Sequence, residues 1–290
     1  MGRRRWSRQV VTVLLVAAVS AGCSPTSAEP EPGATGSPSA ATSATSHTSE
    51  TGPAASGSAT PARPWSIVAL GDSVPAGNAC GCTPYPELTG QDLAAPPDRK
   101  VTVTNDAVSG YTTTDVLAQL QTDATVSDKV RSADIVEIEI GANDVGYSDS
   151  CGDAVSCYAP TVPEVEKNLG TIVSLVRQLT AGRQVLIVLL DYWSVWLGGQ
   201  YAAAQGDAYV ASAAEVTDQV NTVIASTADR TGSAYVDLRA AFKGPDYSYD
   251  ETHYLAPDGD HPNATGHQQI ASATVAVIRS ALHLDPTGKS

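Results

Sequence analysis

Basic side chains are scarce in this sequence. Its 290 residues include 17 lysines and arginines against 31 aspartates and glutamates, which gives a formal net charge of −14. A surface this acidic repels phosphate backbones and anionic lipid headgroups, which argues against a nucleic-acid-binding function. Hydrophobic residues still make up 42% of the chain, enough for a folded core, and the length suits one large or two small domains.

The N-terminal apolar run is too short to cross a membrane. It covers only Val10–Val19, whereas a membrane-spanning helix needs roughly 20 apolar residues. Arginines precede the run and small residues follow it, the order typical of a signal peptide, here over residues 1–22. Its end, with Gly22 directly before Cys23, resembles the lipobox of bacterial lipoproteins. The resemblance implies export, lipidation of Cys23 and anchoring to the cell membrane on its extracellular face; secretion without a lipid is the alternative.

A segment of low complexity follows, over residues 23–64. After the cysteine it consists almost entirely of Ala, Gly, Pro, Ser and Thr. Such a composition buries too little apolar area to offset chain entropy, so we expect a disordered tether with a reach of roughly 35 Å. The sequence is therefore organised as a signal peptide, a tether and one globular domain over residues 65–290.

The globular part alternates β-like and α-like segments. We expect strands at Trp65–Leu70, Val101–Thr104, Asp134–Ile140, Val185–Leu190 and Ala234–Leu238. Apolar residues at helical spacing predict helices at Thr112–Leu120, Val162–Thr180, Ala208–Asp229 and Ala264–Leu282. This alternation is typical of an α/β fold with a mostly parallel sheet between helices, in which ligands bind beyond the carboxyl ends of the strands.

The common nucleophile elbow Gly-x-Ser-x-Gly is absent, but other polar residues follow the expected strands. Ser73 comes directly after the first strand, in Gly71-Asp72-Ser73, where we expect it to open a helix beside free backbone N–H groups. Gly110 follows the second strand, and Asn143 follows the third with a side-chain amide that can donate to an oxyanion. Taken singly, Ser73 is more typical of a helix cap and Gly110 of a turn, and Asn143 is as typical of an Asx-turn as of an oxyanion donor.

A fourth block, Asp258–His267, precedes the last expected helix. Asp258 lies three residues ahead of His261 and can hold its Nδ1–H, which leaves Nε2 free to take a proton. A metal site formed by these two residues with Asp260 and His267 is the alternative, but no ligand pair upstream has a spacing that supports it. We expect His267 itself to be a solvated helix residue.

In this order, the four blocks resemble those of the SGNH (GDSL-type) hydrolase family, which supply Ser, Gly, Asn and His. The resemblance implies a three-layer α/β/α, flavodoxin-like fold with a five-stranded sheet, and no cofactor or metal. It makes Ser73 the nucleophile, His261 its general base and Asp258 the residue that orients the imidazole. The implied oxyanion hole is formed by the backbone N–H groups of Ser73 and Gly110 and the side-chain amide of Asn143.

The cysteines suit an exported protein. If Cys23 carries a lipid, Cys80, Cys82, Cys151 and Cys157 remain as an even set for an oxidising compartment. A Cys151–Cys157 bridge is favoured by its short loop, but it leaves Cys80 and Cys82 to pair across a single residue. The alternative is a pair of bridges that join the two loops.

The substrate is less well defined by the sequence. The segment Asp191–Trp196 follows the fourth strand, so Tyr192, Trp193 and Trp196 are candidates for binding a sugar ring or an acyl chain, as is Tyr111; ordinary packing under a loop is an equal alternative. The family resemblance implies a serine esterase whose partner is a small-molecule or carbohydrate ester. We expect it to be extracytoplasmic and monomeric. Short acyl groups are favoured because no long apolar lid is visible in the sequence. The alternatives are an acyltransferase or deacetylase acting on polysaccharide, a lipase, or a binding module without activity.

Overall fold

The structure is a computed structural model that describes residues 63–95 and 100–284. The expected signal peptide, the lipidation of Cys23 and nearly all of the expected tether lie outside the described residues. Within the described ranges, every helix is too short or too polar to serve as a membrane span.

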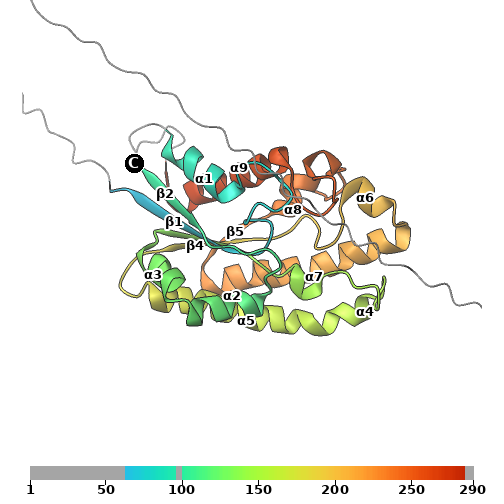
Figure 1. Ribbon diagram of the computed structural model, residues 1–290, viewed down its shortest axis with the longest axis horizontal. Helices are drawn as coiled ribbons and strands as arrows, with labels where there is room; N and C mark the ends of the chain where they lie inside the picture. Colours follow the sequence, from blue (N-terminus) through green and yellow to red (C-terminus); the bar gives the residue numbers. More distant parts are fainter. Residues whose placement is uncertain (1–62, 96–99, 285–290) are drawn as a thin grey trace, which may run out of the picture. The chain divides into compact units, whose positions relative to one another are not determined.

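The described residues form one parallel sheet flanked by helices, as expected (Figure 1). The strands are β1 (Trp65–Gly71), β2 (Val101–Asn105), β3 (Ile135–Glu139), β4 (Leu186–Leu190) and β5 (Ala234–Val236). Their order in the sheet is β2-β1-β3-β4-β5, and every neighbouring pair is parallel. This is the flavodoxin-like order, so the expected α/β fold with five strands is confirmed.

Helices cover both faces of the sheet. They are α1 (Tyr85–Ala94), α2 (Thr113–Thr122), α3 (Ala124–Ser132), α4 (Val155–Tyr158), α5 (Val162–Leu179), α6 (Gly199–Ala203), α7 (Asp207–Thr231), α8 (Leu238–Lys243) and α9 (Ala264–Ala281). Helices α1 and α9 pack together on one face, while α2, α3, α5 and α7 lie on the other (Figure 1). Short 3-10 turns occur at Asn143–Val145, Ala159–Thr161 and Thr252–Tyr254.

Local chemistry explains where these elements pack. Helix α5 buries the apolar stripe seen in the sequence, which includes Val165, Leu169, Ile172, Val173 and Val176. Helix α1 approaches β2 closely at Gly90, where a Cβ atom would lie 2.2 Å from Cγ2 of Val103. Any larger residue at this position would push the helix away from the sheet.

Two sequence expectations are wrong. Ser73 does not open a helix: turns follow it, and α1 begins only at Tyr85. Gly77 and Ala79 have φ values of +78° and +56°, a left-handed conformation that cannot continue an α-helix. His267 is fully buried instead of solvated, because its ring lies under α1, where Nδ1 accepts a 3.1 Å hydrogen bond from the backbone N–H of Tyr85.

Four carboxyl groups are buried in the sheet or directly after its strands. Glu137 and Glu139 of β3 are 0% exposed although apolar and acidic residues alternate there, since helices cover both sides of this central strand. Burial raises the pKa of both glutamates well above the ordinary value. Burial also raises the pKa of Asp72 to about 6 and that of Asp191 to about 7.

We expect the free energy of unfolding to fall as the pH rises from 6.5 to 8. A carboxyl whose folded-state pKa is raised stabilises the fold while it is protonated, and this contribution is lost as the pH passes through the folded-state value. His267, whose pKa burial lowers to about 4, acts in the opposite direction but only below pH 6.5. Urea unfolding at several pH values measures the slope, which Glu137→Gln should flatten. A stability that rises over this range would contradict the expectation.

Candidate active site

Three residues from the first and fourth blocks meet beyond the carboxyl end of β1. His261 Nε2 lies 2.8 Å from Ser73 Oγ, and His261 Nδ1 lies 2.8 Å from Asp258 Oδ2. Since the ionised carboxylate can only accept, Nδ1 carries the proton and Nε2 faces the serine with its lone pair. This arrangement can take a proton from Ser73 and hold the resulting imidazolium.

Asp258 is held as a carboxylate by the loop that it shares with His261. Its Oδ1 accepts backbone hydrogen bonds from Asp260, at 3.2 Å, and from His261, at 3.1 Å. Partial burial acts to raise the pKa of Asp258, but the hydrogen bonds from the His261 side chain and from these backbone groups outweigh it. The pKa is therefore lowered, and Asp258 stays charged at neutral pH.

The second and third blocks are bonded to each other. Asn143 Nδ2 donates to the carbonyl oxygen of Tyr111 at 2.9 Å, and Asp144 accepts from the backbone N–H and the hydroxyl of Thr113 at 2.9 and 2.6 Å. Gly110 has a φ of +84°, which favours glycine, and no atom of the described residues lies within 4 Å of the position that a Cβ atom would take. The backbone at Gly110 is thus open to a bound group.

A cavity of about 370 Å³ joins the first, third and fourth blocks, while Gly110 of the second block is not among its lining residues. Ser73, Asn143 and His261 line it, together with the sequence candidates Tyr192, Trp193 and Trp196. The three aromatic residues are only 1–2% exposed, so they form its walls. Tyr111 is not among its lining residues; it meets the site through its carbonyl oxygen.

A model of the GDSL-like Lipase/Acylhydrolase family matches residues 69–269 of the chain. The chain belongs to this family. It is accordingly a serine hydrolase with esterase or acylhydrolase activity.

Solved structures of low sequence identity share the GDSL fold. The lipase Lip_vut3 from a goat rumen metagenome has a TM-score of 0.56 and 19% identity, over 73% of this chain and 97% of that one. A catalytic mutant of Axe2, an acetylxylan esterase from Geobacillus stearothermophilus, has a TM-score of 0.55 and 23% identity, over 74% and 94%. The lipase/acylhydrolase from Enterococcus faecalis has a TM-score of 0.52 and 22% identity, over 75% and 96%. Among curated proteins, no match is found.

Sequence reasoning missed two polar residues of this GDSL site. Asn78 Nδ2 lies 3.3 Å from His261 Nε2 and can donate to the same lone pair as Ser73. Asp72 is 1% exposed, accepts a hydrogen bond from the backbone N–H of Val74 and accepts another from the hydroxyl of Tyr192. In the sequence, Asp72 could have been identified only by its position beside Ser73, and no sequence feature indicates a role for Asn78.

Two disulfides lie in the loops that follow the first and third blocks. The structure pairs Cys80 with Cys82, with Cα atoms 5.1 Å apart, and Cys151 with Cys157, with Cα atoms 5.8 Å apart. This is the arrangement with two local bridges, and the two loops are not joined to each other by a disulfide. The first bridge lies in the turns after Ser73, and the second closes the segment after Asn143.

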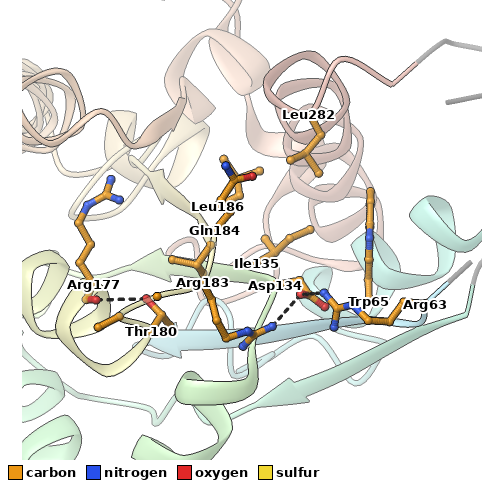
Figure 2. A pocket seen from close by; sticks show the side chains of 13 residues that line it. Arg63, Trp65, Asp134, Ile135, Arg177, Thr180, Arg183, Gln184, Leu186 and Leu282 are labelled. Carbon is orange, nitrogen blue, oxygen red and sulfur yellow. Dashed lines mark hydrogen bonds and ion pairs between the residues drawn. The ribbon is translucent and has the colours of Figure 1, made fainter.

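A larger groove, of about 1090 Å³, lies at the opposite end of the strands, where β1, β3 and β4 begin (Figure 2). Asp134 lies within it and bonds to Arg63 and, at 3.0 Å, to Arg183. None of the site residues expected from the sequence lines this groove. The smaller cavity beside Ser73 is therefore the candidate active site.

Proposed function

We propose that this GDSL-family hydrolase is an extracytoplasmic serine esterase that cleaves short acyl esters through an acyl-enzyme on Ser73. One observation carries the proposal: two hydrogen bonds of 2.8 Å link Ser73 Oγ through the His261 ring to the Asp258 carboxylate. This is the geometry that a nucleophile, its base and an orienting group require.

The reaction follows from these contacts. His261 Nε2 takes the Ser73 proton as Oγ attacks the ester carbonyl carbon, and Asp258 stabilises the imidazolium that forms. The tetrahedral intermediate collapses when His261 gives the proton to the leaving alcohol, which leaves an acyl group on Ser73. Water then attacks this acyl group with the same help from His261, and the free acid departs.

Negative charge develops on the carbonyl oxygen during both attacks. The proposed donors are the backbone N–H groups of Ser73 and Gly110 and the side-chain amide of Asn143. The open space at Gly110 and the position of Asn143 on the cavity wall support this assignment. Preorganised donors of this kind stabilise the transition state because they are already oriented when the charge forms.

The walls of the cavity favour a small acyl group. Trp196 is fixed by a 2.8 Å hydrogen bond from its Nε1 to the carbonyl oxygen of Val145, and Trp193 stacks on Phe242 with ring centroids 4.3 Å apart. Tyr147, which is 43% exposed, packs at the rim against Trp196 and Tyr209. Rigid aromatic walls leave little freedom to admit a long chain.

We expect kcat/KM to be highest for p-nitrophenyl acetate or butyrate and to fall for the octanoate. The physical reason is that the rigid aromatic walls would have to move to admit the longer chain, and this displacement costs binding energy in the transition state. Steady-state hydrolysis of the three esters by the purified chain gives the ranking. Preference for the octanoate would argue instead for a lipase.

We also propose attachment to the cell membrane on its extracellular face through Cys23, on the strength of the lipobox-like sequence and the two disulfides, which are typical of oxidising compartments. In a bacterial host that lipidates proteins, Cys23→Ala should move the esterase from the membrane fraction to the medium. Equal release of both forms would favour plain secretion.

A further inference from the structure

A buried hydrogen-bond chain reaches the proposed nucleophile after β1 from the segment after β4, two strands away in the sheet. Tyr192, directly beyond β4, donates its hydroxyl to Asp72 Oδ2 at 2.6 Å. The other carboxyl oxygen of Asp72, Oδ1, accepts from the backbone N–H of Val74 at 3.0 Å. Asp72 and Val74 are the two chain neighbours of Ser73, so this carboxyl group spans the residue that carries the nucleophile.

Tyr192 is itself fixed at its backbone. Asn221 of α7 accepts from the Tyr192 N–H at 3.2 Å and donates to the Tyr192 carbonyl oxygen at 2.7 Å. Tyr192 is 1% exposed and Asn221 is 7% exposed, so water does not compete for these bonds. Tyr192 is thereby held at its backbone by α7 and at its hydroxyl by the turn that contains Ser73.

Charged and titratable groups from four elements face Asp72. They are Tyr192 after β4, Glu139 of β3, Tyr85 of α1, and Asp260 and His261 in the loop before α9. Burial raises the pKa of Asp72 to about 6, and Asp260 adds to this, whereas the hydrogen bonds from Tyr192 and Val74 and the attraction of His261 lower it. The Tyr192 hydroxyl thus favours the carboxylate, whose charge attracts the imidazolium that forms during catalysis.

We propose that Tyr192 is a positioning residue, whose hydroxyl holds Asp72 as a carboxylate and so fixes the turn that presents Ser73 to His261. This inference rests on the proposed role of Ser73 as the nucleophile. In this role Tyr192 orients the nucleophile and does not act by binding the substrate.

Tyr192→Phe tests the inference, and Tyr235→Phe is the matched control. The Tyr235 hydroxyl donates to another buried carboxyl, Asp191 Oδ2, at 2.5 Å, but neither residue lines the cavity beside Ser73. Loss of a hydrogen bond to a charged group should lower kcat of Tyr192→Phe about 10-fold or more, with KM unchanged. The acid limb of its kcat profile between pH 5 and 8 should move to higher pH, because the pKa of Asp72 rises without the phenol. Tyr235→Phe should leave both kcat and the position of the acid limb of its pH profile unchanged.

Several outcomes would overturn the inference: a higher KM at unchanged kcat, which would make Tyr192 a substrate contact, an acid limb that does not move, or the same change in both variants. If Tyr192→Phe does not fold, Asp72→Asn decides, since it retains an acceptor for Val74 and removes the charge. Its kcat should fall at unchanged KM, and an unchanged kcat would refute the inference.

Labelling with a fluorophosphonate separates this inference from the proposed function. If the wild-type chain is not labelled at Ser73, the proposed nucleophile is wrong. If it is labelled and Tyr192→Phe is labelled at the same rate and with the same pH dependence, only the role of Tyr192 fails. A slower reaction with an acid limb at higher pH, in Tyr192→Phe alone, supports both.

Discussion

Replacing Ser73 with alanine should abolish ester hydrolysis, with a loss of at least about 10⁴-fold in kcat. Without Oγ no acyl-enzyme can form, and His261 loses the group that it contacts at 2.8 Å. The cavity and the proposed oxyanion donors remain, so substrate binding should change little. Steady-state hydrolysis of p-nitrophenyl acetate measures the loss.

Ser174→Ala is a suitable control for this variant. Ser174 lies on the exposed side of α5, where its hydroxyl bonds only to the Gly170 carbonyl oxygen at 2.8 Å. Its activity should match that of the wild type. If Ser73→Ala retained a tenth or more of the wild-type kcat, another residue would have to be the nucleophile.

Asn143→Ala should lower kcat by about 10²–10³ with little change in KM, because an oxyanion donor acts mainly on the transition state. The amide also bonds to Tyr111, so the substitution removes one contact between the second and third blocks. Thermal unfolding of the variant shows whether that contact matters for stability. An unchanged kcat would remove Asn143 from the oxyanion hole.

Periodicity and block order in the sequence predicted much of this fold. The expected strands coincide with β1 to β5 to within about two residues at their ends, since apolar β-branched runs bounded by turns have few alternatives in a parallel sheet. The proposed triad of Ser73, Asp258 and His261 could be predicted because these residues occur in blocks of recognisable composition at the ends of strands and before a helix. Local patterns of this kind are visible in one chain.

Contacts that depend on tertiary packing were not predictable. Tyr192 and Asp72 are 120 residues apart, and nothing in either local sequence indicates their hydrogen bond. The burial of His267 depends on α1 packing over α9, which has no signature in the residues around the histidine. The turns after Ser73 depend on the positive φ of Ala79, and an alanine in the sequence does not predict this conformation.

Because all strands are parallel, the point at which the chain enters the domain and the candidate active site lie at opposite ends of the sheet. The chain enters the domain at Arg63, at the end of the sheet where β1 begins, whereas Ser73 lies beyond the end where β1 finishes. At about 3.3 Å per residue, the seven residues of β1 separate these ends by roughly 20 Å. The cavity beside Ser73 therefore lies at the end of the sheet opposite the one at which the chain enters the domain. Substitutions and tags placed ahead of Arg63 are therefore expected to leave the cavity beside Ser73 undisturbed.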